Sequence, residues 1–273
     1  MSAIPAPNPD RTSLVTGASS GIGTEIARQL AARGQGVTLV ARSEEKLRAL
    51  AGELAAAHGI RAEVLACDLA DAAARASLPD RVAALGLAVN VLVNNAGFST
   101  VGPVHRSDPD AEVAMVRTDV EAVAHLCALF TPGMVERRSG CVLNVASTAA
   151  FQPIPGQAGY GAAKAFVLSY THALRTELRP HGVTVTALCP GPVETGFIAA
   201  AGLDDEVAHQ AMPGPFWVDA ADVARAAVDG LDADRAVVIP GAANRVSAAA
   251  AWLAPRRLLL PLLARQHPGL QET

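Results

Sequence analysis

The chain alternates short apolar runs with longer helical patterns about six times along its 273 residues. Several of these runs are continuously apolar, as is typical of parallel strands that are covered on both faces. The candidate strands are Ser13–Thr16, Val37–Ala41, Ala62–Ala66, Val89–Asn94, Cys141–Ala146, Thr184–Leu188 and Ala236–Ile239. Repeated strand–helix alternation predicts an α/β fold, with a doubly wound parallel sheet between two layers of helices.

Apolar residues recur at helical spacing between the candidate strands. Ile22, Ile26 and Leu30 are four residues apart, and a second series follows Ser43, which we expect to cap its helix. That second series is Leu47, Leu50 and Leu54, and longer helical stretches cover Asp110–Arg138, Gln157–Arg179 and Asp219–Gly230.

No linker, charge block or internal repeat divides the chain, so we expect a single domain over residues 11–241. Residues 1–10 contain three prolines and are expected to form a flexible leader. Residues 191–217 lack periodicity and are rich in glycine and proline, which predicts a substrate loop able to close over the site. The apolar residues 242–273 are expected to form a helical C-terminal extension for packing or for a contact between subunits, with a membrane-surface role as the alternative.

Composition excludes several classes of function. The chain is 51% apolar and 18% charged, with a formal net charge of −4, which gives no electrostatic reason to bind nucleic acid. No uninterrupted apolar run reaches the ~18 residues of a membrane span, so stable membrane insertion is not expected. The N-terminus does not resemble a secretory signal, and the four scattered cysteines indicate thiols in a reducing compartment, without a metal site. We therefore expect a cytoplasmic protein.

The first candidate strand runs directly into the sequence TGASSGIG, residues 16–23. Its glycines allow the backbone to turn tightly and to approach a pyrophosphate, and the helix that follows offers unpaired N–H groups. The residues expected to contribute are Gly17, Ser19, Ser20, Gly21, Ile22 and Gly23. This position between the first strand and the first helix predicts a dinucleotide site.

The end of the second strand predicts which dinucleotide is bound. Arg42 lies nineteen residues after Gly23, where an acidic residue would accept hydrogen bonds from a ribose 2′-hydroxyl. Arg42 and Ser43 instead suit a 2′-phosphate, which favours NADP(H) over NAD(H). Asp68, after the third strand, is a candidate for the adenine amino group, although its spacing fits a turn residue nearly as well.

Tyr160 and Lys164 are four residues apart in a helical stretch, so both project from one face of the helix. Lysine occurs only twice in the chain, against twenty arginines. An ammonium group beside a phenol favours the phenolate, so we expect it to lower the phenol pKa and tune Tyr160 as a proton donor or acceptor. Ser147, at the end of a strand, has a hydroxyl that can bind a substrate carbonyl oxygen, although such a serine is more often a cap.

Together these motifs resemble the short-chain dehydrogenase/reductase family over about residues 11–241. The resemblance rests on TGASSGIG, on Asn94-Asn95-Ala96-Gly97, on Ser147 with Tyr160-x3-Lys164, and on Pro190-Gly191-Pro192-Val193. It implies a Rossmann-type fold with one seven-stranded sheet and a catalytic Ser147, Tyr160 and Lys164. It also implies that the cofactor is held by Asp68, Leu69, Asn95, Ala96, Gly97, Tyr160, Lys164, Pro190, Gly191, Val193 and Thr195.

One position departs from the family pattern. Members carry an asparagine in the middle of the fourth large helix, where this chain has Asp119. The resemblance implies that this residue helps to hold a water and the lysine in a proton relay. An aspartate still offers its backbone carbonyl, so we retain Asp119 as a fourth catalytic candidate.

The expected reaction is hydride transfer between NADP(H) and a carbonyl or alcohol carbon, with Tyr160 as the general acid or base. Residues 192–217 contain no arginine or lysine to bind a phosphate or carboxylate, so a hydrophobic ketone or aldehyde is favoured, with an acyl-thioester ketoacid as an alternative. The expected substrate residues are Phe98, Phe151, Gln157, Phe197 and Phe216. Two other functions stay open: an NADP(H)-binding sensor or scaffold, and a non-redox acid/base enzyme. Family resemblance and the long alanine-rich helices suggest a homodimer or homotetramer.

Overall fold

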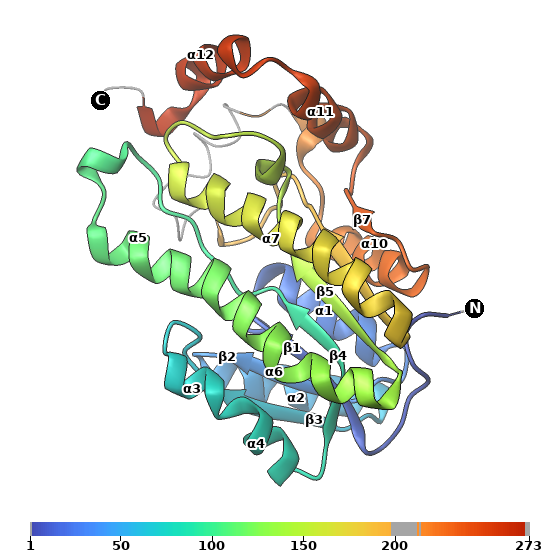
Figure 1. Cartoon of the computed structure of the whole chain (residues 1–273). Coiled ribbons are helices and arrows are strands. Elements are labelled where there is room, and N and C mark those ends of the chain that lie inside the picture. The colour runs from blue at the N-terminus through green and yellow to red at the C-terminus, as the bar shows by residue number, and fades with distance from the viewer. Residues whose placement is uncertain (1, 198–211, 213, 271–273) are drawn as a thin grey trace.

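The computed structural model describes residues 2–197, 212 and 214–270. Seven parallel strands form one sheet in the order β3-β2-β1-β4-β5-β6-β7. The strands are β1 (Arg11–Thr16), β2 (Val37–Ala41), β3 (Ala62–Ala66), β4 (Ala88–Asn94), β5 (Gly140–Val145), β6 (Val183–Leu188) and β7 (Val237–Val238). The predicted doubly wound, seven-stranded parallel sheet is therefore confirmed, and each candidate strand overlaps an observed one (Figure 1).

Helices cover both faces of the sheet. The larger ones are α1 (Gly21–Ala31), α2 (Glu44–His58), α5 (Pro109–Val116), α6 (Ala122–Arg137), α7 (Ala158–Leu178), α10 (Ala220–Asp232), α11 (Ala242–Leu253) and α12 (Arg256–Gln266), and the shorter ones are α3 (Ala72–Ala76) and α4 (Leu78–Ala84). The apolar faces of α1, α2 and α10 pack in one core, and those of α4, α6 and α7 pack in another. Both faces of the strands are thereby buried, which explains their continuously apolar sequences.

The helix expected over Asp110–Arg138 is interrupted. A π-helical turn, Arg117–Glu121, separates α5 from α6 and contains the fully buried Asp119. Such turns insert an extra residue into a helix and often occur at functional sites. Apolar periodicity does not reveal the insertion, because the helical pattern continues on both sides of it.

The structure also tests the expected Ser43 cap and describes the leader. Ser43 occupies the N-cap position of α2, but its side chain makes no capping hydrogen bond. In the leader, Ile4 is buried and its N–H donates to Asp232 Oδ1 at 3.1 Å, so the leader is anchored to α10 at this point.

All four cysteines are free and buried, as expected. Among the described residues, no helix is long and apolar enough to cross a membrane.

Candidate active site

The candidate site lies at the carboxyl ends of the strands. Connections leave β1 and β4 in opposite directions along the sheet, which places a topological switch point between these two neighbouring strands. Ligands of open α/β sheets bind in the crevice at such a point. The glycine-rich turn follows β1, and Asn95, Ala96 and Gly97 follow β4, so the fold brings two of the predicted motifs together.

The glycine-rich turn is packed so closely that side chains are excluded from it. Gly17 has a φ of +65°, and a Cβ atom there would lie 2.8 Å from the Asn95 amide nitrogen. At Gly23 a Cβ would lie 2.3 Å from the Gly17 carbonyl oxygen, so this glycine allows α1 to approach β1. Ser20 is the N-cap of α1 but makes no side-chain capping hydrogen bond. The first-turn N–H groups thus face the turn without a side-chain cap, in an arrangement that suits an anion.

Asn95 holds this turn in place. Its amide nitrogen donates to the Thr16 and Gly17 carbonyl oxygens at 3.0 and 3.3 Å, and its backbone N–H donates to the Thr16 hydroxyl at 2.9 Å. The structure therefore gives Asn95 a positioning role that its sequence motif does not state. The same contacts fix the backbone of Ala96, whose N–H donates to the Thr16 hydroxyl at 3.1 Å.

The residues that follow β2 and β3 are the remaining candidates for binding the adenosine half of a dinucleotide cofactor. Arg42 follows β2, is exposed, and takes part in none of the salt bridges found among the described residues. Asp68 follows β3, and its carboxylate accepts the Ala70 N–H at 2.9 Å, which is the turn role weighed above. Leu69 is buried, and its carbonyl accepts a hydrogen bond from Arg75, so its side chain has a packing role.

Ser147, Tyr160 and Lys164 meet where β5 ends and α7 begins. Ser147 Oγ accepts the Ala149 N–H at 3.1 Å and donates to the Pro190 carbonyl at 3.4 Å. The Lys164 ammonium lies 5.6 Å from the centroid of the Tyr160 ring, and its Nζ donates to the Val145 carbonyl at 3.3 Å. The i, i+4 spacing therefore places the ammonium beside the phenol, as predicted.

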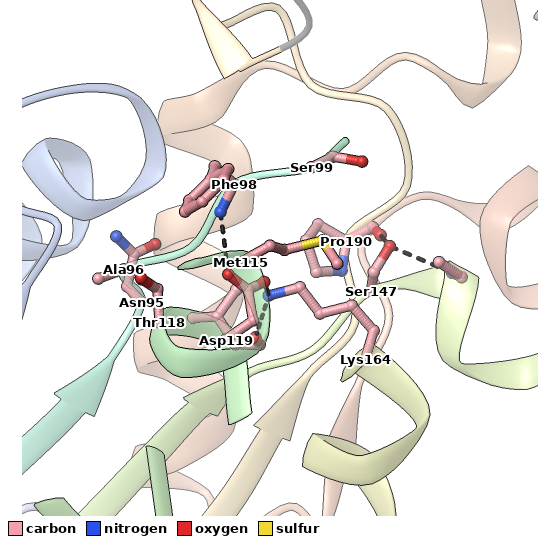
Figure 2. A network of polar contacts seen from close by, with 12 residues as sticks. Asn95, Ala96, Phe98, Ser99, Met115, Thr118, Asp119, Ser147, Lys164 and Pro190 are labelled. Atoms are coloured by element: carbon pink, nitrogen blue, oxygen red, sulfur yellow. Dashed lines mark hydrogen bonds and ion pairs between the residues drawn. The ribbon is translucent and has the colours of Figure 1, made fainter. Parts of the chain in front are cut away.

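Asp119 forms a buried ion pair with Lys164. The Lys164 Nζ lies 2.9 Å from Asp119 Oδ2, and the Phe98 N–H donates to Asp119 Oδ1 at 3.0 Å (Figure 2). A Cβ at Gly97 would lie 2.8 Å from Asp119 Oδ2, so the glycine makes room for the carboxylate. The sequence suggested only a backbone role for Asp119, whereas the structure brings its side chain into direct contact with the lysine.

The ion pair keeps the lysine charged. Burial alone would lower the pKa of the Lys164 ammonium, but the charges of Asp119 and Tyr160 and the hydrogen bond to Asp119 together raise this pKa above its ordinary value. Burial raises the pKa of the Asp119 carboxyl, and the charge of Lys164 and the Phe98 N–H oppose that rise.

The phenol responds to the same charges. Burial raises the pKa of Tyr160, and the Asp119 carboxylate adds to the rise, while Lys164 and a hydrogen bond with Ser147 oppose it. The lowering expected from Lys164 is therefore present, but the expected net direction is wrong, because desolvation of the phenolate is the largest effect. The phenol is accordingly held in its protonated form.

The segment after β6 completes the site. Val193 is buried and pairs with Val218, and the Thr195 side chain packs on Gly21, where a Cβ would lie 3.1 Å from Thr195 Cγ2. This contact joins the segment after β6 to the glycine-rich turn. At Gly191 a Cβ would lie 2.2 Å from Asn244 Oδ1, a side chain that no sequence pattern singled out.

Phe197 and Gln157 are the two expected substrate residues whose side chains make specific contacts in the structure. The Phe197 ring lies 5.8 Å from the Tyr160 ring, so it borders the phenol. Gln157 donates to the Ser99 hydroxyl at 2.7 Å and contacts the His267 ring at 3.1 Å.

Of the remaining three residues, Phe98 adjoins Asp119 through its backbone, and Phe151 lies in the short helix Thr148–Phe151 after Ser147. The Phe216 carbonyl accepts from Asn244 at 2.9 Å. Of the expected substrate loop, residues 198–211 and 213 lie outside the described residues.

Known proteins share this architecture and sequence. A family model described as short chain dehydrogenase matches residues 11–206. A putative ketoacyl reductase of Streptomyces coelicolor is 40% identical over 189 residues, which cover 68% of this chain and 72% of that protein. A very-long-chain 3-oxoacyl-CoA reductase of Anas platyrhynchos is 37% identical over 188 residues, 67% of this chain but only 59% of that protein.

A solved structure extends the likeness to nearly the whole chain. The short-chain dehydrogenase from Sphingobium yanoikuyae in complex with NADPH is 32% identical, with a TM-score of 0.79 over 92% of this chain and 95% of that one. The chain therefore belongs to the short-chain dehydrogenase family of oxidoreductases.

Proposed function

We propose that the protein is an NADP(H)-dependent carbonyl reductase that interconverts a hydrophobic ketone or aldehyde and its alcohol. The observation that carries this proposal is the position of the Tyr160 phenol, which lies beside the ammonium of Lys164 and the hydroxyl of Ser147 at the same sheet edge as the glycine-rich turn. A proton donor next to a dinucleotide cradle is what carbonyl reduction requires.

The residues of the cradle fit a dinucleotide. Gly17 and Gly23 leave no space for side chains, and the uncapped N-terminus of α1 offers N–H groups to a pyrophosphate. Arg42 and Ser43 would bind the 2′-phosphate of NADP(H). The segment 190–195 would border the nicotinamide, since Thr195 packs against Gly21. NADPH in the related Sphingobium yanoikuyae structure supports this choice of cofactor.

The bound cofactor would supply or accept the hydride, and the protein residues manage the proton and the oxygen. Ser147 would donate a hydrogen bond to the carbonyl oxygen, which polarises the bond to be reduced. Tyr160 would donate its proton to the same oxygen as negative charge develops there. Lys164, held charged by Asp119, would stabilise the phenolate that Tyr160 becomes after donation.

The substrate is proposed to be apolar near the reacting carbon. Phe197 borders Tyr160, and residues 192–217 contain no lysine or arginine to bind an anionic group there. An acyl thioester remains compatible, because its carrier would bind elsewhere. Similarity to a putative ketoacyl reductase of Streptomyces coelicolor supports a keto substrate of this kind.

The test is oxidation of NADPH, followed at 340 nm, over a panel of aliphatic, aromatic, steroid and acyl-thioester ketones, with NADH in parallel. We expect turnover of at least one apolar ketone with NADPH, and a Tyr160→Phe variant that loses ~10²-fold or more of it while still binding NADPH. NADPH binding without turnover of any ketone would indicate a sensor or scaffold. Conversion of a substrate without consumption of NADPH would indicate a non-redox acid/base enzyme.

A further inference from the structure

The C-terminal helices α11 and α12 present an apolar and basic surface. Ten large apolar side chains are exposed among the described residues, and five of them lie here: Val246, Trp252, Leu253, Leu258 and Leu262, with exposed fractions of 52–80%. The opposite face of α11 is buried through Asn244, Ala248 and Ala251. The exposed apolar residues are therefore unpartnered rather than part of a core.

The charge of this segment has one sign. Residues 235–271 contain five arginines and no aspartate or glutamate, although the whole chain has a formal net charge of −4. Arg245, Arg256, Arg257 and Arg265 are exposed on the two helices. None of the salt bridges found among the described residues involves these four arginines.

The C-terminal helices contact two of the expected substrate residues, Phe151 and Gln157. The Arg256 guanidinium donates to the Phe151 carbonyl at 3.1 Å, and His267, just after α12, contacts Gln157 at 3.1 Å. Figure 1 shows α11 and α12 together at one end of the molecule, beyond the start of α7. The outward face of the two helices is thus held in a fixed position relative to the rest of the fold.

We propose that the surface formed by Val246, Trp252, Leu253, Leu258, Leu262 and the four exposed arginines docks the protein on an anionic lipid membrane. Helices that lie in a membrane interface combine apolar residues, tryptophan among them, with arginine or lysine, and each basic residue adds attraction to anionic headgroups. At 11 residues, α12 is long enough to lie on a bilayer but far too short to span it.

Charge favours a membrane over a second copy of the chain as the partner. A two-fold contact through this surface would bring the same arginines together from both copies, without an acidic residue of the segment to pair with them. An anionic lipid layer supplies both the negative charge and the apolar phase. If the protein acts on an apolar ketone, as proposed above, docking would also keep the site near dissolved lipophilic substrate, but the docking itself does not depend on that reaction.

The test is flotation of the full chain with vesicles of phosphatidylcholine alone or with 30 mol% phosphatidylglycerol, without cofactor or substrate. We expect binding to the anionic vesicles at least about tenfold tighter than to the neutral ones, and weakened by salt. The double variant Trp252→Ser/Leu253→Ser should lose most of the binding, and Arg245→Gln/Arg257→Gln should lose on the order of tenfold. Arg48→Gln, an exposed arginine on α2, is the matched control and should bind as the unaltered chain does.

Circular dichroism and thermal unfolding show whether each variant is folded. No binding to anionic vesicles, or binding that both double variants retain, would overturn the proposal. Light scattering tests the alternative partner, a second copy of the chain, by measuring the molar mass in solution. If Trp252→Ser/Leu253→Ser converts an oligomer to a smaller species, the surface is an interface between copies and the membrane proposal is wrong. Ketone turnover is not measured here, so failure of the proposed reaction would leave this result intact.

Discussion

Replacing Asp119 with asparagine removes one charge from the centre of the candidate site and keeps nearly the same shape. The Asp119 Oδ2 to Lys164 Nζ distance is 2.9 Å, and Nζ is 5.6 Å from the centroid of the Tyr160 ring, so the carboxylate lies within about 8.5 Å of that centroid. At an effective dielectric constant of about 20, two unit charges at this separation interact by about 2 kcal/mol. That energy corresponds to about a thirtyfold change in an acid dissociation constant, which solvent screening would reduce.

The sign of the effect follows from the charges. Asp119 disfavours the phenolate and thus helps to raise the pKa of Tyr160. In Asp119→Asn the phenol should lose its proton about tenfold to thirtyfold more readily. Alcohol oxidation, which needs the phenolate, should therefore begin at lower pH than in the unaltered protein. Ketone reduction, which needs the phenol, should be lost at a correspondingly lower pH.

The assay is the pH dependence of kcat/KM in both directions, with cofactor binding measured separately at each pH. Asp110→Asn, which changes an exposed carboxylate at the start of α5, is the control and should leave the profile in place. An unmoved midpoint in Asp119→Asn would refute the electrostatic coupling. A midpoint moved to higher pH would also refute it, because it would mean that Lys164 gives up its own proton when the carboxylate is gone.

Four further predictions concern single positions. Arg42→Asp should abolish or reverse the preference for NADPH over NADH in fluorescence titrations, and equal affinities in the unaltered protein would contradict the role of Arg42. Gly23→Ala places a Cβ 2.3 Å from a backbone oxygen and should destabilise the fold by on the order of 2–3 kcal/mol in denaturant titrations. Gly52→Ala, which meets nothing within 4 Å, should instead stabilise α2 by up to ~1 kcal/mol. Phe197→Ala should raise KM for bulky apolar ketones more than for small ones, and equal changes for both would remove Phe197 from the substrate site.

The sequence predicted the fold well because its signals are local. Continuous apolar strands, helical periodicity and the glycine-rich turn each depend on neighbouring residues, and all seven strands were found where they were expected. The spacing of Tyr160 and Lys164 is also local, so a helix necessarily brings the two side chains together.

The contacts that shape the site join residues far apart in the chain, so they could not be predicted from local sequence patterns. The π-helical turn that contains Asp119 leaves no mark in the apolar pattern. The approach of Asn244 to Gly191 and of His267 to Gln157 joins segments far apart in the chain. The net direction of the Tyr160 pKa depends on burial, which only the assembled structure provides.

The buried ion pair between Asp119 and Lys164 affects the protonation of the site residues more than it affects the stability of the fold. Taking Asp119 and Lys164 out of water costs free energy that offsets most of their attraction, so such a pair adds little to the net stability of a fold. An asparagine at position 119 would still offer Lys164 an amide oxygen as a hydrogen-bond acceptor, but no negative charge. With aspartate, the ammonium keeps its proton and the phenol resists ionisation. The raised pKa keeps the Tyr160 phenol protonated at neutral pH, which is the state that the proposed carbonyl reduction would consume. The charged ammonium acts in the opposite direction and favours the phenolate that the proposed alcohol oxidation would need.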